Sequence, residues 1–590
     1  MTFVDNTRLH YLLLFLCAVL LYANTLHHAF VLDDDAVIVR NSYVLQGAEG
    51  IKAIFSHDSF AGFERVGQGA SILEGGRYRP LSLAFFAFIY TLFGPNPLPF
   101  HFFNIVVFAI TGLVLYRTLS VMLNKKLNSG TWVALITTTL FLAHPVHTEV
   151  VANVKSADEI LALLFGLSAL LSLLIAHDTG KKLPVWLSGV FMLLACLAKE
   201  NAITFLVTIP LALWYFRSAQ PRWIGFYIIP IVTGAAVFLM LRESALGGLT
   251  AGTIMKDPLN NPFLQWNGQA WIPCSLATTA ATILYTFWKY VWLIIFPYPL
   301  THDYYPFHIT LQSFLSPAAL GGLLLWIGFL FLGVRSLSKK KAAGYGLLFF
   351  LATLSITANV FIPVGTFMSE RFLFLPSLGI ILSLVLEGKK LAGAEKVKYF
   401  LLSAGIVVLV FSLMTVLRNM AWKDNETLLR TDVNYSPNSA KLQNDVGTII
   451  LENALKESDP ATRKALLQEA LPHLQKANDL HPTYYDALLA NGACAYYVEQ
   501  YELSVASYRR AAQLFPDDGK SNTGLVYALQ AHGKDQWTKG DTTAAFKALR
   551  EAWSIQPDTA TAKQLSSYYE AAGQQALSKE WLARVRQGIR

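Results

Sequence analysis

The sequence predicts an all-α protein, in which a polytopic membrane helical bundle is followed by a C-terminal α-solenoid of helical repeats. Of the 590 residues, 54% are hydrophobic and only 15% are charged, and the mean hydropathy is +0.41. Charged residues make up about a quarter of an ordinary soluble domain, so a single soluble domain does not fit. Apolar blocks long enough to cross a bilayer recur up to about residue 420, whereas the remaining residues are polar and Ala-rich.

The formal net charge of +8 is distributed as expected for a membrane protein. Lys and Arg cluster in short stretches between the apolar blocks, which is typical of cytoplasmic loops under the positive-inside rule. The clusters are Lys125-Lys126, Lys181-Lys182, Arg217 to Arg222, Lys339 to Lys341 and Lys389 to Lys398. A basic groove with interleaved aromatic residues is absent, so no nucleic acid partner is expected. The four cysteines lie far apart and lack metal-ligand spacing.

Eleven spans account for this charge pattern, with the N-terminus in the cytoplasm and the C-terminus outside. A spanning helix needs about 20 apolar residues, and tilting partners or polar hairpin tips can accommodate shorter blocks. The first block lacks a small-residue cleavage site, so we interpret it as a retained anchor. In chain order, the expected spans are 9–26, 100–122, 131–143, 150–176, 184–198, 201–217, 222–241, 316–335, 343–363, 370–387 and 399–418.

Two further blocks, 80–93 and 275–297, are ambiguous. The first is long enough for about half a bilayer and its interface, and Pro-rich polar segments flank the second. If neither crosses, every basic cluster is cytoplasmic; if both cross, the chain has thirteen spans and two basic clusters lie outside. We prefer eleven. The unusual polar segments then share the outer face, namely 27–79, 144–158, 242–274, 301–309 and 365–376.

The C-terminal part, residues 421–590, contains a repeat. Pro437, Pro482, Pro516 and Pro557 each end an apolar helical segment, and their spacings are 45, 34 and 41 residues. Thirty-four is the period of tetratricopeptide repeats, and the other spacings fit if extra residues lie near 456–465 and 531–540. About three units are expected. Such stacks bind peptides or proteins in a concave groove, although bracing the membrane domain is an alternative role.

Small and bulky residues recur at fixed offsets from these prolines, which predicts paired helices in close contact. The bulky members are Leu474, Tyr508 and Leu549. Gly447 and Gly492 supply the small residue in the first two units. In the third unit, Val526 stands at the same offset from its proline.

Three adjacent carboxylates, Asp33, Asp34 and Asp35, follow the first apolar block. Their mutual repulsion could raise the pKa of one of them, which would make that group a better proton acceptor near neutral pH. The alternative is a solvated acidic loop, or a helix N-terminus that is capped by Asp.

Several cations of the predicted outer face could bind an anionic group such as a phosphate. They are Arg77, Arg79, His144, His147, Lys155, Lys199 and Arg371. Arg can bind phosphate in a bidentate manner, whereas a lone interfacial cation more often reaches lipid headgroups. For Lys199, an ion pair with Glu200 at a hairpin tip is the simpler explanation.

The fragments that contain these residues occur in a recognisable order. The first are Phe30 to Asp34 with Ile38 and Asn41, Tyr78 to Leu81, Leu92 to Gly94 and Phe100 to Asn104. Next come His144 to Glu149, Asp158, Leu197 to Glu200, Asn261-Pro262, Asp303-Tyr304, Ser369 to Ser377, Arg418-Asn419 and Trp422 to Asp424. Each fragment alone is weak. Their order across nearly the whole chain resembles that of the transmembrane and tetratricopeptide-repeat-containing O-mannosyltransferases.

The resemblance implies a GT-C fold glycosyltransferase that uses a polyprenyl-phosphate-linked sugar, which is mannose in this family. Asp33 and Asp34 match the acidic pair at the family's catalytic centre, whereas Asp35 falls where many relatives are not acidic. A short repeat array is expected of a bacterial or archaeal member, with the active site and the repeats on the extracytoplasmic side of the cell membrane. In a eukaryote the equivalent place is the lumenal side of the endoplasmic reticulum membrane.

We therefore expect sugar transfer with inversion to a hydroxyl, such as that of Ser or Thr in a protein. Asp34 or Asp33 would accept the hydroxyl proton. The groups expected to stabilise the departing lipid phosphate are Arg371, Arg79, His144, His147 and Lys199. Further site candidates are Asp35, Glu370, Asp158, Asp303 and Lys155. This scheme requires no cofactor, although a divalent ion held by Asp33 to Asp35 stays open. The repeats would recruit the acceptor protein or peptide.

Two other functions stay open. A transporter or flippase for a polyprenyl-linked glycan would favour charged residues at the bilayer midplane and inverted repeats, whereas the polar residues here lie mainly at helix ends. A membrane-tethered scaffold that acts through its repeats would tolerate alanine at Asp33 and Asp34, whereas a transferase would lose turnover. The sequence contains no P-loop, Rossmann glycine pattern or HExxH motif.

Overall fold

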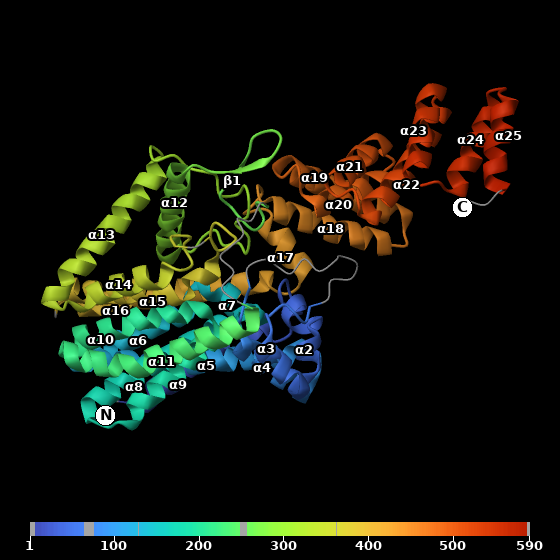
Figure 1. Ribbon diagram of the computed structural model, residues 1–590. Helices are drawn as coiled ribbons and strands as arrows, with labels where there is room; N and C mark the ends of the chain where they lie inside the picture. The colour runs from blue at the N-terminus through green and yellow to red at the C-terminus, as the bar shows by residue number, and fades with distance from the viewer. Residues whose placement is uncertain are drawn as a thin grey trace. The chain divides into compact units, whose positions relative to one another are not determined.

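The computed structural model describes residues 6–63, 76–127, 129–247, 257–361, 363–393 and 395–586. The chain forms two compact units, Met1–Tyr304 with Ile309–Tyr435 and Tyr305–His308 with Ser436–Arg590. The division after Tyr435 lies beyond the expected boundary at residue 420. The described part of the chain is helical apart from one two-stranded hairpin and its loops, which confirms the all-α prediction (Figure 1).

The α-helices and β-strands of the first unit are α1 (Thr7–Tyr22), α2 (Ser42–Leu45), α3 (Ile51–Ser56), α4 (Pro80–Phe93), α5 (Pro97–Asn124), α6 (Gly130–Ala143), α7 (Thr148–Ala152), α8 (Ala157–Thr179), α9 (Leu183–Ala198), α10 (Phe205–Arg217), α11 (Pro221–Leu246), β1 (Leu264–Trp266), β2 (Trp271–Pro273), α12 (Leu276–Ile295), α13 (Pro317–Lys339), α14 (Ala342–Leu354), α15 (Phe374–Ala392), α16 (Val397–Ala421) and α17 (Asn425–Asp432). Short helical turns are η2 (Ala23–Thr25), η3 (Asp35–Val39), η4 (Gly47–Gly50), η5 (Pro145–His147), η6 (Val154–Ser156), η7 (Glu200–Thr204) and η8 (Glu370–Leu373).

Seven helical stretches in the described residues are long and apolar enough to cross a membrane, so the chain is an integral membrane protein. They are Thr7–Thr25, Pro97–Asn124, Val154–Thr179, Pro221–Leu246, Pro317–Lys339, Glu370–Ala392 and Val397–Ala421. Four shorter apolar helices, α4, α6, α9 and α14, accompany them. The predicted count of eleven spans therefore depends on helices such as α6 and α9, whose 14 and 16 residues fall short of a full hydrocarbon core.

Small residues let the helices of this bundle approach closely. A Cβ atom on Gly189 of α9 would lie 2.6 Å from the carbonyl oxygen of Pro230 in α11, and one on Gly379 of α15 would meet the backbone of Gly346 in α14. Because lipid tails are as apolar as the side chains, such tight contacts contribute much of the association energy of membrane helices. One continuous core runs through the bundle, with α5, α6, α8 and α9 as neighbours (Figure 1).

The helices α2, α3 and α4 form a separate layer at one end of the bundle (Figure 1). Its short helices pack on α4 around a second core that includes Val37, Val44 and Phe86. Pro80 occupies the first position of α4, where its missing N–H costs nothing, and Gly94 follows the helix with a φ of 66°. The ambiguous block 80–93 is thus part of this layer.

The other ambiguous block, residues 275–297, contains α12. This helix follows the antiparallel β1–β2 hairpin, in which Leu264 pairs with Pro273. It packs on α13, with Phe287 against Phe329. Its Tyr290 hydroxyl accepts a hydrogen bond of 3.2 Å from the Ser369 N–H, so α12 supports the segment that leads into η8.

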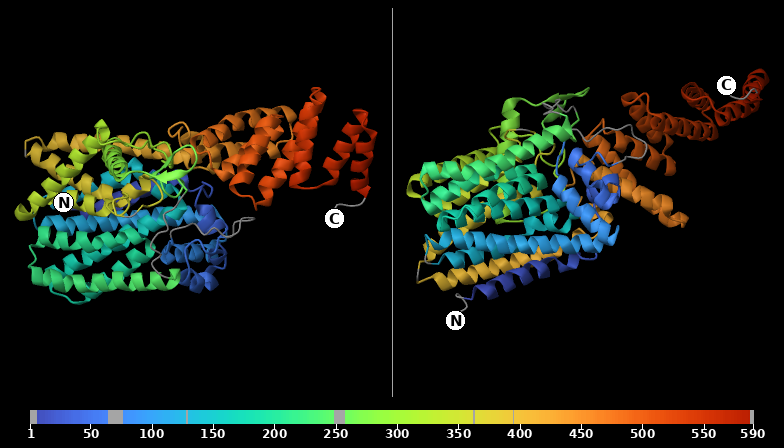
Figure 2. Two further views of the ribbon diagram at one scale, coloured as in Figure 1. Left: turned by 45° about the horizontal axis from the view of Figure 1, so that its top comes forward. Right: turned by 60° about the horizontal axis from the view of Figure 1, so that its bottom comes forward.

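The second unit contains four helix pairs in the residues described there, whereas the sequence predicts about three (Figure 2). The pairs are α18 (Ala440–Lys456) with α19 (Pro460–Leu480), α20 (Tyr485–Tyr497) with α21 (Tyr501–Leu514), α22 (Gly519–Thr538) with α23 (Thr542–Ile555), and α24 (Thr559–Ala571) with α25 (Gln575–Arg586). The fourth pair is missed because it follows Pro557 and no further proline ends it.

Each of the first three pairs is closed by a glycine under a bulky side chain. The contacts are Gly447 with Leu474, Gly492 with Tyr508, and Gly533 with Leu549, where an added Cβ atom would lie 2.6, 2.8 and 2.9 Å from the facing side chain. The prediction that Val526 takes the third small position is wrong. The extra residues of this unit lie in the first half of α22 rather than in the predicted region 531–540, so Gly533 instead faces Leu549.

Candidate active site

The acidic motif occupies a tight turn between α1 and η3. Leu32 adopts a positive φ of 50°, and Asp34 immediately precedes η3. The buried Asp34 carboxylate accepts hydrogen bonds from the Val31 N–H (3.0 Å) and from the Lys155 backbone N–H (2.7 Å). These two bonds close the turn and attach it to η6, which lies more than a hundred residues later in the chain.

Burial raises the pKa of Asp34 to about 7; the two backbone hydrogen bonds oppose this rise, and the neighbouring Asp33 charge adds to it. The sequence predicts a raised pKa in this motif from repulsion between carboxylates. In the structure that repulsion is the smaller cause, because a fully buried carboxylate loses its hydration.

The three carboxylates of the motif diverge. Asp33 lies 3.4 Å from the Lys155 Nζ, with its side chain 41% exposed, and Asp35 pairs with Arg40 at the surface. A divalent cation needs several oxygen ligands that converge, so this arrangement does not fit one. The described residues also contain no group of three His, Cys, Asp or Glu side chains that could hold a metal ion.

Four of the predicted phosphate-binding cations and candidates meet around Asp158. Arg79 Nη1 donates to the Asp158 carboxylate at 2.8 Å, and Lys199 Nζ lies 3.3 Å from both of its oxygens. Lys155 and Arg371 interact with the same carboxylate electrostatically. These residues come from the ends of five elements, and the bundle brings them together.

The partners of Arg79 and Lys199 differ from the expected ones. Arg79 donates in a bidentate manner to Glu200, with bonds of 2.9 and 2.6 Å. Burial alone would lower the pKa of Arg79, but the Glu200 and Asp158 charges raise it above its ordinary value. Lys199 lies 2.7 Å from Glu159 Oε1. The predicted Lys199–Glu200 ion pair is therefore wrong: these neighbours point to different partners.

Arg371 is held by Glu149. Its Nη1 and its backbone N–H each donate to the Glu149 carboxylate at 3.1 Å. The Arg371 side chain keeps 25% of its surface exposed, whereas that of Glu149 is almost completely buried.

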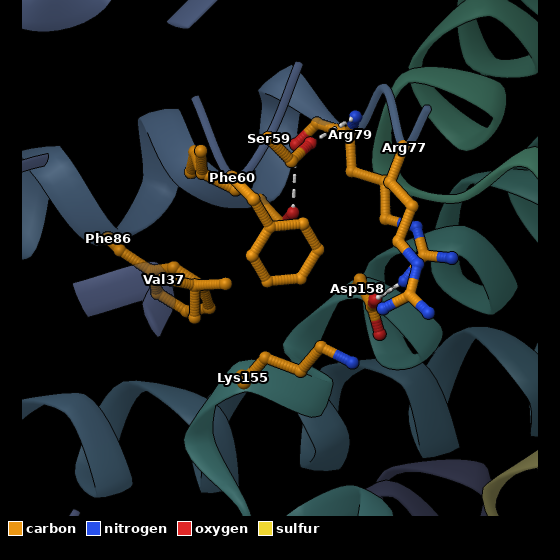
Figure 3. A pocket seen from close by; sticks show the side chains of 10 residues that line it. Val37, Ser59, Phe60, Arg77, Arg79, Phe86, Lys155 and Asp158 are labelled. Carbon is orange, nitrogen blue, oxygen red and sulfur yellow. Dashed lines mark hydrogen bonds and ion pairs between the residues drawn. The ribbon is translucent and has the colours of Figure 1, made fainter. Parts of the chain in front are cut away.

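A small pocket lies beside this cluster. It is lined by Val37, Ser59, Phe60, Arg77, Arg79, Ser82, Leu83, Phe86, Lys155 and Asp158. Arg77, Arg79, Lys155 and Asp158 gather at one end of it, and the apolar side chains of Val37, Phe60 and Phe86 line the other (Figure 3). Such a pocket offers charge to an anionic group and an apolar wall to what is attached to it.

The two predicted histidines are in an apolar environment. His144 Nε2 lies 2.8 Å from the Ile294 carbonyl oxygen, and its Nδ1 accepts the Val146 N–H. His147 bonds to the Phe141 carbonyl and to Ser377. Burial lowers the pKa of His144 to about 4 and that of His147 well below its ordinary value, so neither ring carries a charge near neutral pH.

Glu370 and Asp303 belong to another buried group. Glu370 accepts the Thr301 N–H at 2.5 Å and the Tyr304 hydroxyl at 2.8 Å. Asp303 is buried in the same segment, and its N–H lies 3.4 Å from Thr301 Oγ1. Glu370 thus holds the segment 301–304 next to η8, whereas the Asp303 N–H bond lies within that segment.

The fragment Trp422 to Asp424 packs on the acidic turn. The Ala29 N–H donates to the Lys423 carbonyl at 2.9 Å, and the Leu32 N–H donates to Asn425 Oδ1 at 2.8 Å. Val31 and Trp422 share one buried apolar cluster. The end of the last apolar helix therefore braces the turn that carries Asp33 and Asp34.

Comparison with known proteins gives a consistent relationship. No protein-family model matches the chain. Protein O-mannosyl-transferase TMTC1 from Homo sapiens is 27% identical over 511 residues, which cover 80% of this chain and 55% of that protein. Protein O-mannosyl-transferase F38B6.6 from Caenorhabditis elegans is 27% identical over 75% of this chain and 60% of its own. Protein O-mannosyl-transferase TMTC3 from Mus musculus is 25% identical over 84% of this chain and 54% of its own.

Over most of its length the chain is similar to proteins that are named O-mannosyl-transferases. This similarity confirms the resemblance found in the order of the sequence fragments. The chain spans about half the length of the curated relatives it matches.

Sequence reasoning missed two carboxylates of this candidate site and misread the partner of a third. Glu149 and Glu159 stand next to predicted site residues but were assigned no role, and Glu200 was paired with the wrong cation. A cluster of cations near a membrane indicates that carboxylate partners must exist, because buried charges need them. Which carboxylate meets which cation depends on packing.

Proposed function

We propose that this chain is a membrane glycosyltransferase. It moves a sugar, which the names of its relatives indicate to be mannose, from a polyprenyl-phosphate donor to a Ser or Thr hydroxyl of a protein, with inversion. One observation carries the proposal: Lys155 joins the acidic turn to the cation cluster, since its backbone binds Asp34 and its Nζ lies 3.4 Å from Asp33. A proton acceptor and phosphate-binding cations are thereby neighbours.

Asp33 is the better candidate for the general base. Its carboxylate is 41% exposed, so an acceptor hydroxyl can reach it. Asp34 is fully buried, and backbone N–H groups engage both of its oxygens. In the proposed reaction Asp33 takes the hydroxyl proton while the hydroxyl oxygen attacks the anomeric carbon and the bond to the lipid phosphate breaks. Asp34 holds the turn and the Lys155 backbone in place.

The departing phosphate would be stabilised by Lys155 and Arg371, with Arg79 and Lys199 behind them. Asp33 and Arg371 are both electrostatic neighbours of Lys155. Cations that are already held in place stabilise developing charge without reorganisation. His144 and His147 are uncharged, so their proposed role is to support the backbone near Glu149 rather than to bind phosphate.

The site and the repeats would face the extracytoplasmic side, opposite the basic clusters such as Lys339 to Lys341. Nucleotide sugars are cytosolic, whereas a lipid-phosphate donor presents its sugar at the outer surface. The repeats would recruit the acceptor and so raise its effective concentration at Asp33.

The test uses the full-length protein in nanodiscs, radiolabelled polyprenyl-phosphate-mannose and a Ser/Thr-rich peptide. D33N and D34N are compared with wild type, and D35N is the matched control because Asp35 pairs with Arg40 at the surface. We expect transfer by wild type and D35N and a loss of at least about a hundredfold for D33N. If D33N transfers sugar as fast as wild type, Asp33 is not the general base. If wild type transfers no sugar from any polyprenyl-phosphate donor, the glycosyltransferase proposal fails.

A further inference from the structure

Glu149 is a buried carboxylate to which the proposed reaction gives no part. It lies in α7, and its surface is 2% exposed. Its side-chain carboxylate accepts hydrogen bonds from the segment Ser369–Arg371. The Ser369 hydroxyl lies 3.4 Å from Oε2 and 3.5 Å from Oε1, the Arg371 N–H lies 3.1 Å from Oε2, and Arg371 Nη1 lies 3.1 Å from Oε1.

This arrangement holds Arg371 at both ends. One carboxylate oxygen binds the backbone of Arg371 and the other binds its guanidinium, so the long side chain is restrained at its base and at its tip. A free Arg side chain would have to give up its rotamer freedom when it binds an anion. The restraint by Glu149 removes much of that loss before the ligand arrives.

A second contact, from another helix, supports the same segment. The Ser369 N–H donates to the Tyr290 hydroxyl of α12 at 3.2 Å. Ser369–Arg371 is therefore held by α7 and by α12 together. The Arg371 side chain stays 25% exposed, and Arg371 interacts electrostatically with Lys155 and with Asp158 of the cation cluster.

We propose that Glu149 is a positioning residue that directs Arg371 toward the phosphate of the lipid-linked donor. This inference rests on the proposed function. The geometry sets two effects of Glu149 against each other. Its charge partly neutralises Arg371, which weakens attraction for phosphate, and its two oxygens fix the guanidinium, which strengthens binding. Arg371 is bound at backbone and tip by one carboxylate, so the fixing effect outweighs the neutralising one.

The central experiment replaces Glu149 by Gln, which keeps the shape and removes the charge. The amide still offers one oxygen, but its NH₂ group faces the second Arg371 donor, so one of the two ends is released. We expect the donor KM and the inhibition constant of free polyprenyl phosphate to rise about tenfold, since a charge-assisted hydrogen bond is lost. The acceptor KM stays unchanged. E387Q is the matched control, because Glu387 pairs with Lys390 on the exposed surface of α15.

A double-variant comparison separates positioning from a general structural role. If Glu149 acts through Arg371, E149Q added to R371M changes polyprenyl-phosphate affinity by less than about twofold. The same tenfold loss in the R371M background would overturn the inference, and so would a tighter donor KM for E149Q alone. If E149Q lowers the thermal midpoint, E149D gives the comparison instead, because it keeps the charge but shortens its reach.

Failure of the two proposals can be told apart. Polyprenyl-phosphate affinity is measured by direct binding in nanodiscs and does not depend on turnover. Wild type that binds polyprenyl phosphate without transferring sugar contradicts the proposed function but leaves Glu149 testable. Wild-type transfer with unchanged affinity in E149Q contradicts only the role of Glu149.

Discussion

Charge compensation dominates the site at the scale of single residues. Each cation of the cluster has a carboxylate partner: Glu200 and Asp158 for Arg79, Glu159 for Lys199, Glu149 for Arg371 and Asp33 for Lys155. Unpaired charges next to a bilayer would be strongly destabilising, so these partners allow the cations to stay in place without a ligand. A donor phosphate must then share the cations with the protein's own carboxylates.

The guanidinium of Arg79, a fork that donates to Glu200 and to Asp158, gives the first prediction. Arg79→Lys keeps the charge, but one ammonium cannot hold both Glu200 and Asp158 as the guanidinium does. We expect a loss of about 1–2 kcal/mol in stability and at least tenfold in turnover. Thermal unfolding in detergent and the transfer assay measure these effects. Arg40→Lys is the control, because that exposed pair should change stability by less than about 0.5 kcal/mol. Equal behaviour of both variants would contradict the role of the fork.

The buried Asp34 gives the second prediction. Its pKa is raised to about 7, so between pH 4 and 7 the folded state binds a proton that the unfolded state has released. The contribution of Asp34 to stability therefore falls as the pH rises through this window and stays low above it. We expect the thermal midpoint of wild type to fall more steeply between pH 5 and 8 than that of D34N, which does not titrate. Parallel curves would show that Asp34 is already ionised at pH 5.

The glycine contacts decide how the repeats pack at the scale of helices. Gly533 lies beneath Leu549, with 2.9 Å available to an added Cβ atom, so a larger residue would force α22 and α23 apart. We expect Gly533→Val to destabilise this pair by about 2 kcal/mol. Hydrogen exchange of α22 and α23 in the full-length protein measures the loss. Gly519→Ala is the control, since an added Cβ atom there meets nothing within 4 Å. Unchanged protection in Gly533→Val would refute the contact.

The sidedness of the whole molecule gives the last prediction. In a variant whose four cysteines are replaced by Ser, single cysteines at the exposed positions Gln46, Ser458 and Lys339 report on the two faces. A membrane-impermeant maleimide should label the cysteines at 46 and 458 in sealed right-side-out vesicles, and the one at 339 only after permeabilisation. These outcomes follow from the basic clusters being cytoplasmic. Labelling of the cysteine at 339 in sealed vesicles would show that the predicted topology is wrong.

Local patterns in the sequence were sufficient for much of this protein. Apolar length and scarce charge determined a helical membrane protein, because a bilayer requires helices whose backbone groups are satisfied internally. Proline spacing indicated the repeats, and the order of short fragments indicated the family. The same fragments contain Arg79, Asp158, Lys199 and Arg371, and Lys155 lies between two of them; the structure brings all five residues together.

Tertiary structure decided everything that depends on which distant groups meet. Asp34 is buried because η6 closes over it, and Lys199 pairs with Glu159 rather than with its neighbour Glu200. Gly533 replaces Val526 as the small residue because α22 carries its extra residues before the contact. Periodicity and composition report on near neighbours in the chain, whereas burial and charge pairing depend on how helices pack across hundreds of residues. For that reason the sequence alone determined the kind of protein and its candidate residues, and the packing determined their partners.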